Sequence, residues 1–146
     1  MNMLNEIHIQ YLKLPKAEFV LGSFEDKLCL CDFRYRKMRS SVDKRIKNAL
    51  KAEFIERNNR LLEKTKRQID EYLDGERTDF TIPILTIGSK FQNKVWQALE
   101  KIPYGKTASY LDIAKMIERE KSVKAVANAN GANSLALIIT LPSYHW

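Results

Sequence analysis

Cys29 and Cys31, within the sequence LCLCDF, are the candidates of this chain for a thiol nucleophile, a disulfide or a pair of zinc ligands. One residue separates them on an apparent strand, so their side chains are expected to point the same way and could not easily form a relaxed disulfide. Two ligands do not make a zinc site. No histidine lies near them in sequence to activate a thiolate, although the fold could still bring one close. We interpret both as structural thiols of a reduced compartment.

The second chemical signal is basic charge. The chain has a formal net charge of +7, and residues 34–67 hold thirteen Lys and Arg against four Asp and Glu. Residues 91–146 hold seven against four. Such an excess favours a polyanionic partner with salt-dependent affinity. A basic run is also commonly the solvated face of a helix, so charge alone does not identify the partner.

Length and composition are those of a globular protein. The 146 residues correspond to one domain or two small ones, and a hydrophobic share of 45% is enough for a packed core. No apolar run approaches the roughly 18 residues of a membrane span. The start, MNMLNEIHIQYLKLPK, has no continuous apolar stretch and does not resemble a signal peptide. We expect a cytoplasmic protein without membrane contact.

The elements that position these residues begin with a hairpin. The sequence EFVLGSFEDKLCLCDF, residues 18–33, predicts two short strands around a turn near residues 25–27. Leu28 and Leu30 alternate with the two cysteines, which is the period of a sheet with one packed face.

A helix and a connector are predicted next. Residues 34–58 are charged and weakly periodic, and could form a loop or a loose helix. Apolar residues at helical spacing predict a helix over residues 60–73, which Gly75 stops. Residues 80–84 look like an extended connector, because Pro83 argues against a central strand.

Beyond a boundary near Gly88 the pattern changes to short helices. Ser89 can cap the first, which presents one apolar face. Ser109 can cap the second, with Asp112 in the capping-box position. A third helix begins at about residue 122, and Gly131 suits its end.

A short apolar run follows the third helix. Residues 135–139, LALII, are bounded by polar residues and are expected to form a buried strand. Two short helices joined by a tight turn and followed by a strand are typical of a winged helix-turn-helix.

The C-terminal half resembles a known family. FQNKVWQALEKIPYGKTASYLDIAKMI and KSVKAVANANGANSLALII are similar to the DNA-binding domain of the methylated-DNA–protein-cysteine methyltransferases. The residues upstream resemble that family more loosely. The resemblance implies an α+β protein, with a small N-terminal antiparallel-sheet, ribonuclease-H-like domain over residues 1–84. A winged helix-turn-helix DNA-binding domain would occupy residues 85–146.

The family moves an alkyl group from guanine onto its own cysteine, which requires the damaged base to be extruded from the duplex. The resemblance implies that the third helix enters the minor groove, with Lys124 at the position where most members have an arginine wedge. An ammonium group lacks the planar face of a guanidinium, so we expect a weaker hold on flipped DNA. Ala125, Ala127 and Ala129 would let the helix sit close in the groove, although alanines are also simply good helix formers. Asn128 and Asn130 complete the expected DNA-contacting set on this helix.

Tyr110 matches the family tyrosine that presses on the phosphate of the target nucleotide. Read without the family, it is an aromatic residue packing within its own helix. Thr107 and Ser109 could meet phosphates, and they are equally adequate as plain helix caps. Asn133 matches the asparagine that orients the active-site turn, and it could otherwise be an ordinary polar loop residue.

The family continues with Pro-Cys-His-Arg after the apolar run, and that cysteine accepts the alkyl group. Here Ile139 is followed by TLPSYHW, with no cysteine. These residues can be encoded as ACC CTG CCA TCG TAT CAT TGG, and omission of the first base yields Pro-Cys-His-Arg-Ile-Ile-Gly. The hypothesis is that one extra nucleotide shifted the frame and truncated the product. An inactive chain would result.

Three interpretations remain open at this point. The first is a repair methyltransferase by descent, inactive without its acceptor. The second is a non-enzymatic lesion binder like the alkyltransferase-like proteins, with Ser143 as a genuine substitution. The third is a winged-helix regulator without lesion specificity. The expected partner is double-stranded DNA carrying alkylated guanine, with no cofactor and no metal. We expect a monomer of marginal stability, or self-association through apolar surface left exposed by truncation.

Overall fold

The computed structural model describes residues 5–15 and 17–139 and contains one four-stranded sheet. Its strands are β1 (Asn5–Lys13), β2 (Glu18–Phe24), β3 (Lys27–Phe33) and β4 (Ala52–Glu56), in the order β3-β2-β1-β4. β2 pairs antiparallel with both β1 and β3, whereas β4 pairs parallel with β1. The expected sheet domain is therefore confirmed, and its sheet is mixed where the sequence predicted a purely antiparallel one.

The hairpin between β2 and β3 turns where the sequence predicted. Glu25 and Asp26 have φ of 49° and 62°, so both adopt the left-handed conformation of a tight two-residue hairpin turn. Aspartate tolerates this conformation better than most residues, because its short polar side chain can bond the local backbone. The turn fixes the start of β3.

A β-bulge in β3 corrects the expected direction of the two cysteines. Gly22 pairs with Leu30 while Ser23 pairs with Leu28, which leaves Cys29 as the extra residue. Such an insertion reverses the alternation of side chains beyond it. Cys31 therefore packs on one face of the sheet with Leu28, and Cys29 packs on the other with Leu30. The expectation that the cysteines point the same way is wrong, and both faces of this strand are packed.

Two helices cover the two faces. α1 (Arg39–Leu50) buries Val42 and Ile46 against the face that holds Cys29. α2 (Arg60–Leu73) buries Leu62 and Ile69 in the cluster that holds Cys31. The predicted helix over residues 60–73 is confirmed. Residues 34–58 are more ordered than expected, since they contain both α1 and β4.

The connector after α2 lies along the outer edge of β3. The amide of Leu28 donates to Pro83 O at 2.8 Å, and the amide of Leu85 donates to Leu28 O at 2.8 Å. Ile84 thereby forms a parallel bridge with Leu28. The expected extended connector is confirmed.

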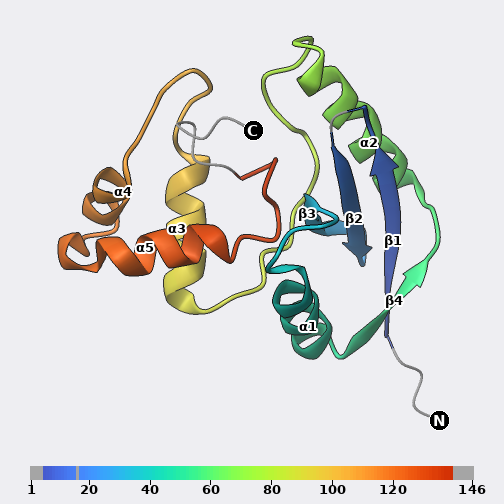
Figure 1. Cartoon of the computed structure of the whole chain (residues 1–146), viewed down its shortest axis with the longest axis horizontal. Helices are drawn as coiled ribbons and strands as arrows, with labels where there is room; N and C mark the ends of the chain where they lie inside the picture. Colours follow the sequence, from blue (N-terminus) through green and yellow to red (C-terminus); the bar gives the residue numbers. More distant parts are fainter. Residues whose placement is uncertain (1–4, 16, 140–146) are drawn as a thin grey trace.

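The C-terminal half is helical, with α3 (Lys90–Glu100), α4 (Tyr110–Met116) and α5 (Val123–Gly131), and a single 3-10 turn at Glu120–Ser122. Figure 1 shows these helices on one side of the molecule and the sheet with α2 on the other. Ser89 and Ser109 close capping boxes with Gln92 and Asp112, so both predicted helix starts are confirmed. Trp96 and Leu99 of α3 are buried in the core cluster shared with α2 and the sheet.

The apolar run after α5 corrects a second expectation. Leu135 forms one isolated bridge, to Cys31, and the chain then turns, because the amides of Ile138 and Ile139 both donate to Leu135 O. The expected strand over residues 135–139 is wrong. Within the described ranges, no strand accompanies α3–α5, so a wing is not seen there.

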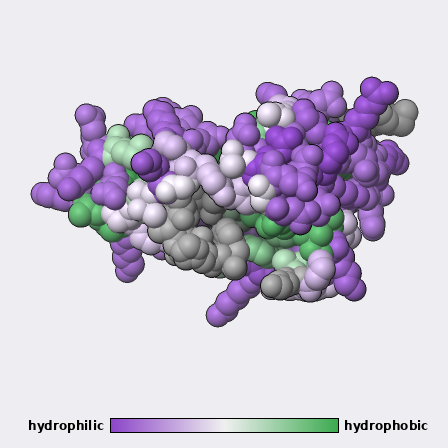
Figure 2. Space-filling model, turned by 90° about the horizontal axis from the view of Figure 1, so that it is seen from above, coloured by the Kyte–Doolittle hydropathy of each residue, from purple (hydrophilic) through white to green (hydrophobic). Residues whose placement is uncertain are grey.

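Hydrophilic residues cover most of the face seen in Figure 2, and hydrophobic residues show in smaller areas between them. None of the described helices has the length and apolar character needed to cross a membrane.

Candidate nucleic-acid interface

α4 begins at a capping box that fixes the residues before it. Ser109 Oγ accepts from the amide of Asp112 at 3.0 Å, and Asp112 Oδ2 accepts from the amide of Ser109 at 2.9 Å. These bonds from Ser109 lower the pKa of the Asp112 carboxyl below its ordinary value. Ser109 and Thr107 are both exposed. The predicted capping box is therefore present, and Thr107 and Ser109 both remain at the surface.

Tyr110, the first residue of α4, joins α4 to α5. Its ring is half-buried and packs against the main core cluster. Its hydroxyl accepts from Asn130 Nδ2 at 3.4 Å. The structure therefore brings these two candidate residues together.

α5 presents an exposed face and a buried one. Lys124, Ala125 and Asn128 are exposed, and their spacing of one, three and four residues places them on one side of the helix. Val126 and Ala129 are buried against the core. Ala129 therefore cannot line a groove, which corrects the expectation that three alanines share the outer face; Ala127 is half-buried.

A hydrogen bond from Trp96 joins α3 to α5. Its indole Nε1 donates to Ala129 O at 2.9 Å, and its side chain is 2% exposed. A buried indole needs such a partner, and Ala129 O, which also accepts from the amide of Ala132 at 3.2 Å, has a second lone pair for it. Core packing and the exposed face of α5 are thus connected through one residue.

Asn133 closes the turn that follows α5. Its Oδ1 accepts from the amide of Leu135 at 2.8 Å, and its Nδ2 donates to Ile139 O. Asn133 is 4% exposed. A buried amide side chain that bonds two backbone groups of one turn fixes the shape of that turn. TLPSYHW, on which the acceptor and frameshift hypotheses depend, lies outside the described residues.

The same turn is attached to the sheet. The amide of Cys31 donates to Ser134 O at 2.7 Å, and the amide of Ala136 donates to Cys31 O at 2.9 Å. Ser134 Oγ also donates to Cys29 O at 3.0 Å. Backbone groups of β3 therefore hold the segment between α5 and Ile139.

The two thiols, Cys29 and Cys31, lie in the strand that holds this turn. Cys29 and Cys31 are free and buried. Burial raises the pKa of both thiols to about 12, and the neighbouring charge of Asp32 adds to the effect on Cys31. A buried neutral thiol is inert at ordinary pH. The interpretation of both as structural thiols is confirmed.

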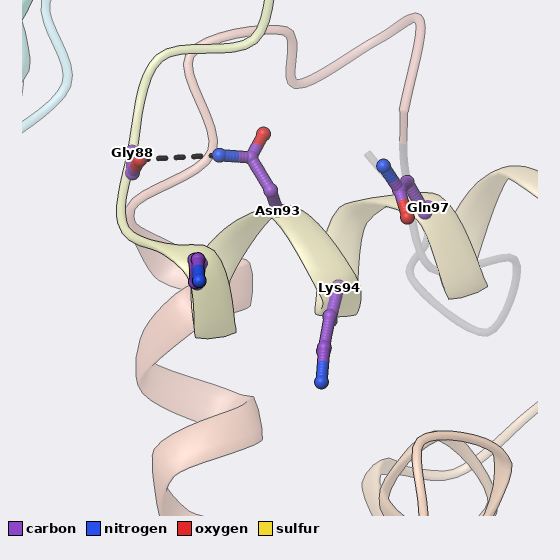
Figure 3. Close-up of a pocket in the computed structure, with 5 residues that line it drawn as sticks. Gly88, Asn93, Lys94 and Gln97 are labelled. Atoms are coloured by element: carbon purple, nitrogen blue, oxygen red, sulfur yellow. Dashed lines mark hydrogen bonds between the residues drawn. The ribbon is translucent and has the colours of Figure 1, made fainter.

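Two cavities of the described residues are lined by residues other than the candidates. A cavity of about 880 Å³ is lined by the end of α2, the connector, the Pro103–Gly105 loop and residues 137–139. A second, of about 430 Å³, lies beside the start of α3 and is lined by Lys90, Lys94 and Gln97 with Asn93, whose Nδ2 donates to Gly88 O at 3.1 Å (Figure 3). Among the residues described, no group of three or more His, Cys, Asp or Glu could hold a metal ion.

Two family models match the chain. One, described as the ribonuclease-like domain of 6-O-methylguanine DNA methyltransferase, matches residues 8–86. The other, described as the DNA binding domain of 6-O-methylguanine DNA methyltransferase, matches residues 90–142.

Relatives carry names from the same family. A methylated-DNA–protein-cysteine methyltransferase of Methanosarcina barkeri is 38% identical over 133 residues, covering 91% of this chain and 78% of that protein. The constitutive protein of that name from Bacillus subtilis is 47% identical over 78 residues, covering 53% of this chain and 47% of that protein. The chain thus spans about half the length of some curated relatives that it matches.

Solved structures agree. The crystal structure of Mycobacterium tuberculosis OGT in complex with DNA matches with a TM-score of 0.76 and 27% identity, over 90% of this chain and 74% of that one. The structure of the R37K form of the same protein has a TM-score of 0.74 and 28% identity, over 91% of this chain and 74% of that one.

Proposed function

Since the chain belongs to the 6-O-methylguanine DNA methyltransferase family, we propose that it is a DNA repair protein that binds duplex DNA carrying an alkylated guanine. The lesion is extruded into the protein, and α5 enters the minor groove. In the form of these 146 residues the chain holds the lesion without transferring the alkyl group to itself.

The observation that carries the proposal is the exposed face of α5. Lys124 supplies a positive charge, and Asn128 and Ala125 beside it present small or hydrogen-bonding groups. Minor-groove proteins use such cationic and amide side chains to follow the groove, and small residues let a helix approach closely. The net charge of +7 supports a polyanionic partner.

The start of α4 supplies the phosphate contacts of this proposal. Thr107 and Ser109 are exposed, and Tyr110 stands between them and α5 through its bond to Asn130. Exposed hydroxyl groups near a helix start are suited to phosphate oxygens. Tyr110 would press on the phosphate of the extruded nucleotide, as the resemblance implies. Asn133 would orient the turn beside the lesion.

The proposal of binding without transfer is supported by the state of Cys29 and Cys31. Alkyl transfer to sulfur needs a thiolate in contact with the alkyl carbon. Both thiols of the chain are buried in β3, and both have a pKa raised to about 12. Neither of these two thiols is therefore suited to accept an alkyl group from DNA, which supports lesion binding as the activity proposed for these residues.

Two measurements test the function. Fluorescence anisotropy with labelled duplexes should show tighter binding to a duplex containing O6-methylguanine than to the matched guanine duplex, and weaker binding to both as salt rises. Equal affinity for the two duplexes would favour a winged-helix regulator without lesion specificity. Incubation with tritiated methylguanine DNA should leave no label on the protein, and a labelled cysteine would refute binding without transfer.

The coding sequence beyond Ile139 decides between the two family-based alternatives. Codons compatible with a shifted Pro-Cys-His-Arg would support a methyltransferase that lost its acceptor by a change of frame. Codons that cannot encode that string would favour a lesion binder that resembles the alkyltransferase-like proteins. The same binding surface serves both.

A further inference from the structure

The end of α5 is held by side chains from outside the helix. Arg36 Nη1 donates to Gly131 O at 2.8 Å, and Arg45 Nη2 donates to Ala132 O at 2.7 Å. Trp96 supplies the third donor, to Ala129 O. In the sequence, Arg45 lies 87 residues from Ala132, and Arg36 lies 95 residues from Gly131. Two arginines of the sheet domain therefore bond to the end of α5, the helix proposed to enter DNA.

The arginines bond the carbonyl groups at the very end of α5. The backbone amides of Ala132 and Asn133 bond to the carbonyl groups of residues 128–130, whereas Gly131 O and Ala132 O accept from the arginines. The last four carbonyl groups of an α-helix have no partner within the helix, and a left-handed glycine after the end commonly supplies one turn of compensating bonds. The residue after α5 is Ala132, with φ of −85° and ψ of −2°, so that motif is not formed. The two arginines extend the backbone bonds at the end of the helix to Gly131 O and Ala132 O.

The arginines are themselves held in a charged cluster, which we define as Arg36, Arg39 and Arg45. Asp32 Oδ2 lies 3.0 Å from Arg36 Nε and 2.9 Å from Arg39 Nη1, with the carboxylate side chain fully buried. Arg39 also pairs with Asp43 at 2.7 Å. Arg36 and Arg39 thus share two carboxylates, and Arg45 is the third cation of the cluster.

Arg45 is the member of the cluster without a carboxylate partner among the ion pairs of the described residues. Burial, reinforced by repulsion from Arg36 and Arg39, lowers its pKa. Its guanidinium lies 5.7 Å from the centre of the Trp96 ring. The negative end of the α5 dipole compensates a cation placed at the last carbonyl groups. Figure 1 shows the end of α5 directed toward α1, the helix that carries Arg45.

We propose that Arg36 and Arg45 are positioning residues for DNA binding: they fix the end of α5, and with it the angle at which Lys124 and Asn128 meet the minor groove. The inference rests on the proposed function. Neither arginine touches DNA. Both residues belong to the sheet domain and restrain α5 from there. The basic composition of residues 34–67, taken alone, would instead suggest direct DNA contact.

Arg45→Met is the informative variant, because it removes one donor and leaves the ion pairs of Asp32 intact. Hydrogen exchange of the amides of residues 128–132 should accelerate by roughly tenfold or more, as expected for a lost charge-assisted bond. Affinity for the O6-methylguanine duplex should fall by a comparable factor, about tenfold. Arg45→Lys keeps a donor for Ala132 O and should retain most of the affinity. Arg36→Met should act in the same direction.

Two controls on α1 separate positioning from charge and from stability. Lys44→Met removes the same charge from the neighbouring exposed position and should leave exchange and affinity unchanged. Ile46→Val removes a methylene from the sheet-domain core and should lower Tm without lowering affinity at a temperature where the protein is folded. Affinity that follows Tm in all variants would overturn the positioning role.

The outcomes also separate this inference from the proposed function. If the parent chain binds the methylguanine duplex and Arg45→Met binds equally well, the positioning role is overturned and the function stands. If exchange at residues 128–132 does not change in Arg45→Met, the role is overturned as well. If the parent chain binds no DNA, the proposed function fails, and the role that rests on it fails with it.

Discussion

Trp96 and Ala129 are joined by a buried hydrogen bond, from the indole Nε1 to the carbonyl oxygen, at 2.9 Å. The two residues lie on α3 and α5, and both are 2% exposed. The bond ties the core of the helical half to the helix that carries the exposed Lys124. Changes in the core near Trp96 are therefore expected to reach the proposed DNA face.

Trp96→Phe keeps an aromatic ring and removes the donor. The carbonyl of Ala129 would be left buried with one partner fewer, which costs about 1–3 kcal/mol of unfolding free energy. Urea denaturation followed by circular dichroism measures the change. Leu99→Ile, a volume-conserving change in the same core, is the control and should cost less than about 1.5 kcal/mol. A loss for Trp96→Phe within the range of the control would show that the hydrogen bond contributes little.

Gly88→Ala should destabilise the start of α3. A Cβ on Gly88 would lie 2.5 Å from Trp96 Cη2 and 2.5 Å from Gln92 Oε1, the side chain that closes the capping box. The indole is fixed by its own packing, so we expect a loss of about 1–3 kcal/mol, measured by thermal or urea unfolding. Gly131→Ala is the matched control, since nothing lies within 4 Å of its added Cβ. That control should be neutral or stabilising by up to about 1 kcal/mol; equal effects at both positions would contradict the steric explanation.

Lys124→Ala should weaken DNA binding and reduce its dependence on salt. A side chain that neutralises one phosphate contributes about one to the slope of log affinity against log salt, so the slope should fall by about 1. Lys27→Ala, at the exposed start of β3, is the charge-matched control and should leave the slope unchanged. Lys124→Arg should instead strengthen binding to a flipped-base duplex, because a planar guanidinium can stack in the vacated space. Unchanged affinity of Lys124→Arg would count against the wedge position.

The two cysteines should resist modification until the protein unfolds. Both thiols are buried with a pKa of about 12, so a disulfide reagent at pH 8 should label neither in native protein and both in urea. Rapid native labelling of either one would show that the strand opens.

The same shift predicts a dependence of stability on pH. In the unfolded chain the thiols ionise near their ordinary value of 9.0, whereas in the folded protein they remain protonated to about 12. Their contribution to stability is complete below pH 9 and is lost progressively as pH rises from 9 toward 12. A Cys29→Ala, Cys31→Val variant should lose less stability than the parent over that interval. Parallel loss in both proteins would assign the alkaline effect to other groups.

The helices of the C-terminal half could be predicted because their signals are local. Ser89 and Ser109 each precede an apolar repeat with a capping partner three residues on, and both capping boxes are present. The hairpin turn at Glu25 and Asp26 was equally local. β1 was missed although Ile7 and Ile9 alternate with polar residues, a signal that was available in the sequence.

The predictions that failed concern residues whose structure depends on partners distant in the sequence. In the apolar run after Asn133, Leu135 pairs with Cys31 of β3 and the chain then turns. A short apolar run does not by itself distinguish a buried strand from a buried turn. The bulge at Cys29 depends on pairing with β2. The basic segment was predicted to face solvent or nucleic acid, whereas Arg36 and Arg45 bond to carbonyl groups about 90 positions away.

The covered outer edge of β3 has one more consequence. Ile84 covers that edge near Leu28, and Leu135 covers it near Cys31, so both ends of the strand already have backbone partners. The opposite edge is β4, which is only five residues long and carries Glu53 and Glu56. Short, charged or covered edges prevent the sheets of separate molecules from adding strands to one another. The contacts that hold the turn in place also protect the sheet against fibre-like aggregation.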